Sequence, residues 1–314
     1  MIEIFKTNTN TEQLEITNNY EPDIWVNVID PSEAEITILE EKLGLDSDTI
    51  KQVLNEEEIS RIELEDNRIL TLIDVPIIEK RAHHFSFNTC PFGIIIIEDK
   101  YIVTMCSKEI EFLNKFKTNS IKGFHTAKKN RFTLQILSSV AREYLKNLKI
   151  VNEETERAEK FIGKATENKD LLKLLSIDKS LVYLTTSLKA NEVVFERLFN
   201  GSILTIYEED KDIIEEAIIK NKQAIELAQI YKDILNGMTT SFATISSNNL
   251  NNIMKFLASM TIVLSIPTMI ASFMGMNVKL TAFDKSNYSF YIIIGVAFML
   301  SFLLARILKK KNML

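Results

Sequence analysis

The sequence predicts an α+β cytoplasmic domain, followed by a long stalk helix and a two-helix transmembrane hairpin. Short β-branched runs fill the first third of the 314-residue chain, as is typical of strands. Proline is absent between Pro91 and Pro267, where good helix formers dominate. Two long uncharged runs lie near the carboxyl terminus. We therefore expect a cytoplasmic α/β domain over residues 1–118, a helical region with the stalk over residues 119–250, and a membrane domain over residues 251–314.

The sequence of the first domain predicts strands and a few short helices. Residues 24–29, 68–75, 92–97 and 101–105 are apolar, β-branched runs of strand length. Asp99-Lys100 separates the last two and predicts a tight turn, hence a hairpin. Pro31 opens a helical stretch, and residues 46–54 predict a second helix.

The helical region begins near residue 131. Gly163 and Gly201 are plausible breaks, and from about residue 203 to residue 274 only Gly237 interrupts the helical pattern. A single helix of that length would extend on the order of 100 Å, at 1.5 Å per residue. Such a helix cannot be buried in a small domain, so it must run along partner helices or cross into another phase.

Two membrane spans are expected, at about residues 256–276 and 287–307. Residues 256–278 and 286–305 are uncharged runs of 23 and 20 positions, and about 20 apolar residues cross a bilayer. The alternative, a pair of buried core helices, is disfavoured because the runs lie back to back with polar flanks. Lys255, Arg306 and residues 309–311 flank the spans with positive charge, which places both termini in the cytoplasm. The predicted location is the cell (inner or plasma) membrane, as a multi-pass protein.

Charge and motifs exclude several classes of function. Residues 251–314 carry seven basic side chains and one acid, a net charge of +6, so the first 250 residues carry −12 of the total of −6. An acidic body argues against nucleic-acid binding. The phosphate-loop, nucleophile-elbow and metalloprotease motifs are absent from the sequence, so we expect neither an enzyme nor an organic cofactor. The amino terminus does not resemble a signal peptide.

The two cysteines, Cys90 and Cys106, lie in or beside apolar runs and are interpreted as small buried hydrophobic residues. His83, His84 and Cys90 lie within eight residues of one another. A zinc site there lacks a fourth ligand, so we expect ordinary strand and loop residues.

A polar stripe runs along the first predicted span. Its members recur at three- and four-residue spacing and mix hydroxyl and amide groups with apolar side chains: Asn251, Met254, Leu257, Thr261, Ser265 and Thr268. This mixture of side chains suits the lining of a narrow pathway that contains water. The second span is almost wholly apolar, as expected of a helix that faces lipid. Because two spans cannot enclose a pore, a pore requires several copies of the chain around an axis.

The first span ends in Gly275-Met276-Asn277. This tripeptide, at the end of the first of two carboxy-terminal spans, resembles the Gly-Met-Asn signature of the CorA family of magnesium transporters. The stretches SSNNLNNIMKFL and VLNEEEISRIELEDNRILTLIDVP also resemble that family. The lysine-rich carboxyl end agrees with it, so the resemblance covers essentially the whole chain.

The resemblance implies a funnel-shaped homopentamer with a central pore for Mg2+, with Co2+ and Ni2+ as further candidate ions. Asn277 would form a ring of amides at the selectivity filter, together with Gly275 and Met276. The stripe residues would line the pore. Regulatory Mg2+ would bind between neighbouring cytoplasmic domains, where the family alignment places Glu216, with Asp212 one turn earlier. The implied partners are other copies of the chain, membrane lipid and divalent cations.

The sequence departs from the family pattern at three places. Met274 stands where an aromatic residue is usual, and Ser265 stands where some members have Met. The outer loop VKLTAFDKSN lacks the Met-Pro-Glu-Leu stretch, which weakens the expectation of an acidic ring that concentrates cations.

The filter and gate residues suit a hydrated ion. Mg2+ gives up its water reluctantly, and amide oxygens can accept hydrogen bonds from its water shell without holding the ion too tightly. Met254 and Leu257, one turn apart, could form an apolar constriction that closes by dewetting.

Two alternative functions remain at this stage. A relative of the same family could carry Zn2+ or another divalent ion, although soft metals favour His and Cys and residues 251–314 contain neither. A membrane-tethered structural or sensor protein is the alternative from a different class.

Overall fold

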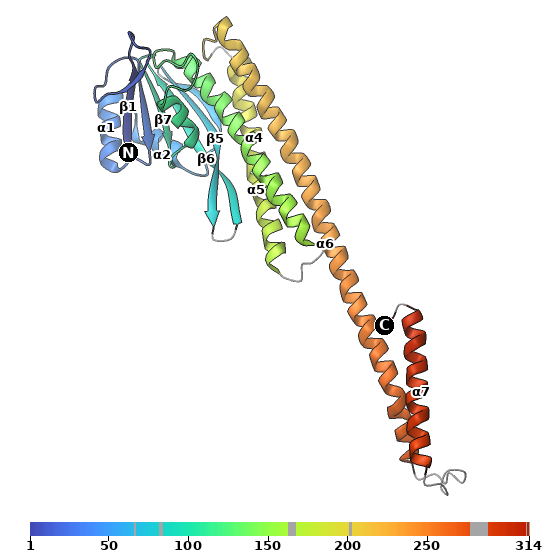
Figure 1. The fold of residues 1–314 in the computed structure, drawn as a ribbon. Helices are drawn as coiled ribbons and strands as arrows, with labels where there is room; N and C mark the ends of the chain where they lie inside the picture. Colours follow the sequence, from blue (N-terminus) through green and yellow to red (C-terminus); the bar gives the residue numbers. More distant parts are fainter. Residues whose placement is uncertain are drawn as a thin grey trace. The chain divides into compact units, whose positions relative to one another are not determined.

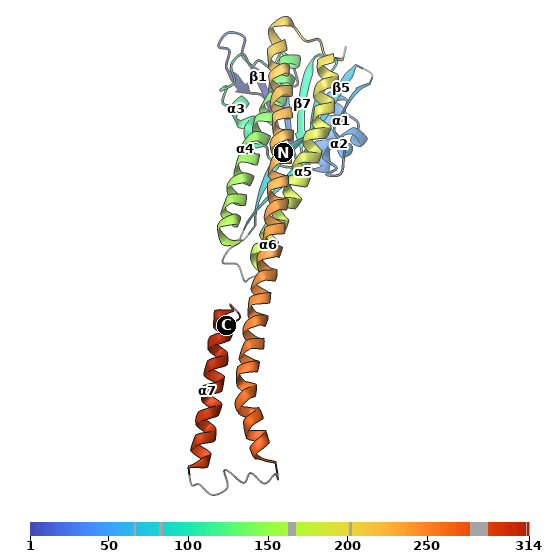
Figure 2. The same cartoon turned by 90° about the vertical axis from the view of Figure 1, so that its right-hand side faces the viewer.

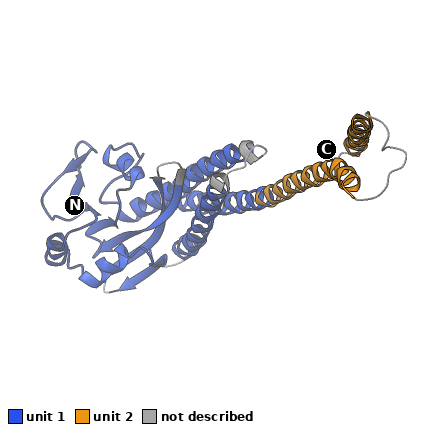
Figure 3. Cartoon of the chain, turned by 90° about the horizontal axis from the view of Figure 1, so that it is seen from below, with its two compact units in different colours: residues 1–238 blue, residues 239–314 orange. Residues whose placement is uncertain are grey.

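The computed structural model describes residues 1–65, 67–81, 84–162, 168–200, 203–276, 288–311 and 313; Figure 1 draws the ribbon. The chain divides into two compact units, Met1–Met238 and Thr239–Leu314, which Figure 3 colours separately. Helix α6 (Lys211–Met274) contributes residues to both units.

The first unit is built on a seven-stranded sheet with the order β2-β1-β3-β7-β6-β5-β4. Neighbouring strands are antiparallel except for the parallel pair β3 and β7. The strands are β1 (Ile2–Thr7), β2 (Leu14–Ile16), β3 (Ile24–Ile29), β4 (Arg61–Glu65), β5 (Arg68–Arg81), β6 (His84–Ile97) and β7 (Tyr101–Cys106).

Two short helices, α1 (Glu33–Leu43) and α2 (Ser47–Leu54), cover one face of the sheet. Ser32 and Glu35 form a reciprocal capping box at the start of α1, which satisfies backbone N–H groups that lack a helical partner. Gly44 ends α1 in the left-handed conformation, with φ of 64°. The apolar residues of both helices join the strand residues in one buried core.

Gly93 allows α2 to approach β6 closely. A Cβ atom at this position would lie 2.5 Å from Cγ1 of Val53, which is a steric clash. We expect Gly93→Ala to destabilise the protein by about 1–3 kcal/mol, the usual effect of overpacking. Val53→Ala should relieve the clash, so the double variant should unfold at a higher temperature than the sum of the two single effects predicts. Thermal unfolding of the four proteins measures this coupling, and purely additive effects would contradict it.

The longer helices cover the opposite face (Figures 1 and 2). There Trp25 stacks on Phe5, with ring centroids 4.9 Å apart, and meets Phe132 edge to face. The indole N–H of Trp25 donates to the Thr104 hydroxyl at 2.8 Å. The helices on this side of the sheet include two short ones, η1 (Glu111–Leu113) and α3 (Asn114–Lys117), and two long ones, α4 (Lys129–Ile162) and α5 (Asn168–Asn200).

A buried amide attaches α5 to β5. The Asn191 side chain accepts from the Asp74 backbone N–H at 2.8 Å and donates to the Asp74 carbonyl at 2.8 Å. It also accepts from the Ser60 hydroxyl at 3.1 Å. Since Asn191 is fully buried, these bonds fix the register of the helix on the strand.

The second unit contains the carboxy-terminal part of α6 and helix α7 (Ser289–Lys310), which lie side by side in Figures 1 and 2. Both helices are long and apolar enough to cross a membrane. Of the most apolar 18 residues in each, only 6% and 17% are buried. Core helices of a soluble protein would be mostly buried, so this exposure favours membrane spans.

Most predicted elements are present, with changed lengths. The strand predicted at residues 24–29 coincides with β3, whereas β5 and β6 extend well beyond the predicted runs. The structure adds β1, β2 and β4, which the sequence did not predict. The long helix begins at Lys211 after the short helix η2 (Glu208–Asp210), not near residue 203. The predicted breaks at Gly163 and Gly201 lie outside the described residues.

Candidate ion pathway and acidic site

Helix α6 continues unbroken through the first predicted span to Met274. Pro267 is the one proline inside the helix. Proline removes one backbone donor, which membrane helices tolerate when other groups satisfy the freed carbonyl.

The six stripe residues lie together on one exposed side of α6. With about 3.6 residues per turn, they fall within an arc of about 120°. All six side chains are exposed in the single chain, with Met254 at 58% and Leu257 at 53%. The structure therefore brings these predicted residues onto a common surface that is open to further subunits.

The opposite side of α6 is the covered side. Between residues 251 and 276, all described, Ser259 is the one buried residue, and Val263, Ile266, Pro267 and Ile270 are partly buried. These positions are centred roughly 180° from the stripe, given about 100° per residue. On α7, the buried residues Ala297, Ser301 and Leu308 share one face, and small side chains there let membrane helices approach closely.

Ser259 also binds the end of the chain. Its hydroxyl donates to the Met313 carbonyl at 2.8 Å. The Met313 N–H in turn donates to the Leu308 carbonyl at 3.1 Å, so the chain turns back at the end of α7. This contact holds the carboxy-terminal segment on the side of α6 away from the stripe.

The stripe hydroxyls donate to their own helix. Thr261 and Thr268 donate to the carbonyls of Leu257 and Leu264 at 2.9 and 3.0 Å. Ser265 donates to the Ile262 carbonyl at 2.8 Å. Because each hydroxyl hydrogen is used in this way, the oxygen that remains exposed is a hydrogen-bond acceptor. A row of acceptors suits the hydrogens of a cation's water shell.

The helix ends just before the predicted filter. The Gly275 N–H donates to the Ala271 carbonyl at 3.0 Å, and the Met276 N–H donates to the Phe273 carbonyl at 3.3 Å. Gly275 and Met276 thus form a turn directly after the end of α6. Asn277 lies outside the described residues.

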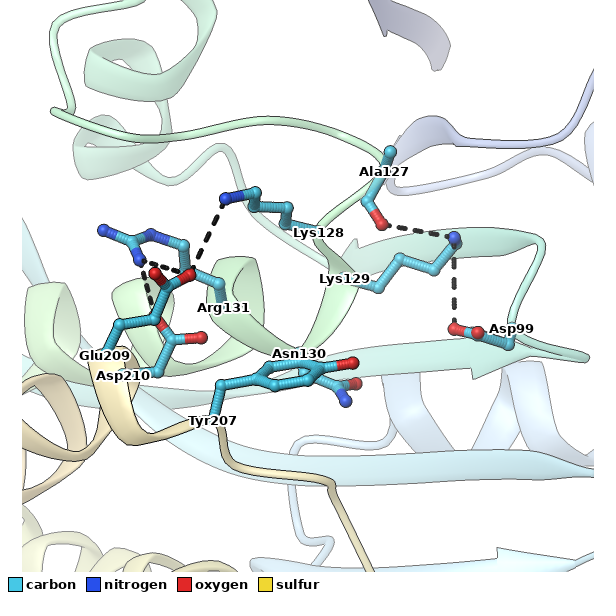
Figure 4. A pocket seen from close by; sticks show the side chains of 9 residues that line it. All are labelled: Asp99, Ala127, Lys128, Lys129, Asn130, Arg131, Tyr207, Glu209 and Asp210. Atoms are coloured by element: carbon cyan, nitrogen blue, oxygen red, sulfur yellow. Dashed lines mark hydrogen bonds and ion pairs between the residues drawn. The ribbon is translucent and has the colours of Figure 1, made fainter.

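The acidic segment before α6 is largely paired with basic side chains at the start of α4 and with Lys128, which precedes that helix. Asp210 is buried and lies 2.6 Å from Arg131, and Glu209 lies 3.7 Å from both Arg131 and Lys128. Figure 4 shows these pairs on one side of a pocket of about 280 Å³ and Lys129, 4.0 Å from Asp99, on the other. A buried carboxylate needs such a partner, so these acids hold the start of α6 on α4.

Glu216 is also paired, and both Glu216 and Asp212 are exposed. Arg142 binds Glu216 at 3.1 Å, and Lys220 forms a second ion pair with it. The hydrogen bond from Lys220 and the charge of Arg142 hold the pKa of Glu216 below its usual value. Among the described residues, no group of three or more His, Cys, Asp or Glu side chains is arranged to hold a metal ion.

Sequence reasoning missed the partners of these sites. Arg131 and Arg142 lie 79 and 74 positions from the acids that they bind, and Ser259 is 54 positions from Met313. The spacing of residues along the chain carries no signal for contacts of this range.

Comparisons with known proteins agree on one family. The cobalt/magnesium transport protein CorA of Methanocaldococcus jannaschii is 24% identical over 282 residues, which cover 87% of this chain and 86% of the relative. The complete structure of the CorA magnesium transporter from that organism matches with a TM-score of 0.82 at 22% identity, covering 98% of this chain and 97% of the other. The structure of the full-length CmaX protein matches with a TM-score of 0.65 at 12% identity, over the same shares of the two chains.

The family profile of the CorA-like Mg2+ transporter protein matches residues 23–310, which is most of the chain. The α/β unit, the long helix and the two apolar carboxy-terminal helices agree with that match. The chain therefore belongs to the family of CorA-like Mg2+ transporter proteins, which are membrane proteins that carry divalent cations.

Proposed function

We propose that this chain assembles into a homopentameric channel that moves Mg2+ across the cell membrane. The side of α6 that carries Asn251, Met254, Leu257, Thr261, Ser265 and Thr268 lines a central pore. Asn277 forms a ring of amides at the outer filter, and intracellular Mg2+ closes the channel. Both chain termini lie in the cytoplasm, and lipid surrounds α7.

The observation that carries this proposal is the opposition of two sides on α6. One side meets the carboxy-terminal segment and α7, and the stripe lies roughly opposite, exposed over its whole length. A helix in lipid gains nothing from a row of exposed hydroxyl and amide groups. If the stripes of several subunits face one another around a shared axis, these groups contact the water of a central pore.

The acceptor character of the stripe supports transport of a hydrated cation. Thr261, Ser265 and Thr268 present oxygens whose hydrogens are already bonded to the helix. Such oxygens can accept from water around Mg2+ without displacing it, which matters because Mg2+ dehydrates reluctantly. Weak, repeated contacts of this kind let an ion pass and leave.

Uptake by purified protein in sealed vesicles tests this proposal. Vesicles that contain a Mg2+-sensitive dye should brighten on addition of external Mg2+, and empty vesicles should not. Parallel trials with Co2+, Ni2+ and Zn2+ rank the ions. If protein-loaded vesicles admit none of these ions, the channel proposal is wrong, and a tethered structural or sensor role gains support.

The regulatory part of the proposal places Mg2+ at Asp212 and Glu216, on the first two turns of α6. Carboxylate oxygens fit the preference of Mg2+, and further ligands would come from water and a neighbouring subunit. The metal would compete with Arg142 and Lys220 for Glu216, so binding would exchange an ion pair within a subunit for a link between subunits. Such a link stabilises the closed state only if it is absent from the open one.

We expect Asp212→Asn combined with Glu216→Gln to weaken closure. Uptake by the double variant should continue at internal Mg2+ concentrations several-fold above those that silence the parent protein. Dye-loaded vesicles prepared over a series of internal Mg2+ concentrations measure this shift. Glu40→Gln with Glu41→Gln, on exposed positions of α1, makes the same change in charge and should leave the response unchanged. An identical shut-off in the double variant and the parent would place the sensor elsewhere.

A further inference from the structure

The two cysteines of the chain meet in the core of the first unit. Cys90 lies within β6, and Cys106 is the last residue of β7. Their sulfur atoms are 2.9 Å apart. Both residues are buried, at 1% and 2% exposure, and the sequence contains no other cysteine.

The pairing of the strands explains this contact. Cys106 of β7 is directly opposite Phe92 of β6. Cys90 lies on β6, two residues before Phe92. Alternate residues of a strand point to the same face, so the two thiols are diagonal neighbours on one side of the sheet. Both sulfurs also lie near the Pro91 carbonyl oxygen, at 3.5 and 3.4 Å.

We propose that Cys90 and Cys106 form a reversible disulfide when the first unit is exposed to hydrogen peroxide. A disulfide bond is about 2.05 Å long, so the sulfurs need to approach by roughly 0.9 Å. The backbone at the site is already paired, since Cys106 pairs with Phe92 and Cys90 pairs with Val75 of β5. The bond would therefore form within the existing sheet.

The two thiols are not equivalent. The hydrogen bond from Cys106 lowers the pKa of Cys90, and the positive charge of Lys108 acts in the same direction. The same contact, with burial, raises the pKa of Cys106. Since the thiolate is the nucleophile, Cys90 reacts first and Cys106 resolves the product.

The reaction balances with one molecule of hydrogen peroxide. The Cys90 thiolate attacks one peroxide oxygen, the O–O bond breaks, and the hydroxide that leaves takes a proton to become water. Cys90 is then a sulfenic acid. The Cys106 sulfur attacks the Cys90 sulfur, the S–S bond forms, and the S–O bond breaks to release a second water. The thiols lose two electrons, the peroxide gains two, and a dithiol reductant reverses the change.

Burial limits which oxidants reach the pair. A cavity of about 260 Å³ lies beside this end of the sheet and is lined in part by Pro76 and Lys108. It is large enough for peroxide. Because Cys106 ends its strand, local opening there costs less than opening in the middle of the sheet. Hydrogen peroxide should therefore oxidise the two thiols faster than a bulky aromatic disulfide reagent does.

Intact-mass measurement of the purified full-length protein tests the proposal. The reduced protein is treated with hydrogen peroxide, denatured, and alkylated. The expected product lacks two hydrogen atoms, carries no alkyl group, and runs as a single chain on a non-reducing gel. Dithiothreitol should restore two alkylatable thiols. Two alkylated cysteines after peroxide treatment, or a disulfide between chains as the main product, would overturn the proposal.

Single-cysteine variants and thermal unfolding supply matched controls. Cys106→Ser should stop at the Cys90 sulfenic acid, whereas Cys90→Ser should react more slowly because Cys106 is the poorer nucleophile. A crosslink restricts the unfolded chain, so oxidation should raise the unfolding temperature of the parent by several degrees and leave both variants unchanged. Equal peroxide reactivity of the two variants, or equal unfolding temperatures of oxidised and reduced parent, would contradict the proposed pair.

Discussion

Asn277→Ala is expected to abolish Mg2+ uptake while the oligomer stays assembled. In the sequence Asn277 directly follows Gly275 and Met276, which come after the end of α6 at Met274. A ring of amide oxygens there would accept hydrogen bonds from the water shell of the ion, which the methyl group of Ala cannot do. The lost contacts all lie in one ring, so a single substitution removes them from every subunit at once.

The measurement is initial uptake in dye-loaded vesicles, with oligomer size checked by gel filtration in the same detergent. Asn252→Ala is the matched control, because it removes the same amide from α6 at an exposed position about 100° round the helix from Asn251. That variant should keep most of the parental uptake. If Asn277→Ala transports normally, the filter lies elsewhere on the pathway.

The membrane half of the fold could be predicted because its signals are local. Two uncharged runs and their basic flanks lie in consecutive residues, and the helical spacing of the stripe is a property of one segment. The structure accordingly places Asn251, Leu257 and Thr268 on the same exposed side of α6. Their predicted role at the pore depends on other subunits and stays a proposal.

The sheet was harder to predict because strand pairing is not local. The short strand β2 has only three residues, and β4 includes three charged residues among its five, so neither shows the apolar pattern of a buried strand. Each is instead held by its neighbour, β1 or β5. β6 extends back to His84 because it pairs along its whole length with β5.

The charges of the acidic segment show the same limit. Residues 208–210, 212, 215 and 216 are all acidic, yet Asp210 is buried against Arg131 and Glu216 binds Arg142. Both arginines belong to α4, far earlier in the chain. The contact of Cys90 with Cys106 likewise depends on the register of two strands, which the sequence alone does not give.

Leu257→Ser is expected to raise the leak of Mg2+ at high internal Mg2+ by several-fold. In the proposed pore, the side chains of Met254 and Leu257 from all subunits form an apolar ring near the inner face. Water leaves a narrow apolar constriction, and a hydrated ion cannot cross it. A serine hydroxyl lets water remain, so the closed state would conduct.

The leak is measured in vesicles whose internal Mg2+ is high enough to silence the parent, with oligomer size as a check on assembly. Phe256→Ser is the matched control, since Phe256 and Leu257 are similarly exposed, at 50% and 53%, and point about 100° apart. That variant changes the side of α6 that points away from the centre of the stripe and should stay silent. The combination of Met254→Ser with Leu257→Ser should leak more than either single variant, because two adjacent turns of the constriction become wet. Should assembled Leu257→Ser remain as tight as the parent, Leu257 packs against a neighbouring helix, and the constriction lies at another level of the pore.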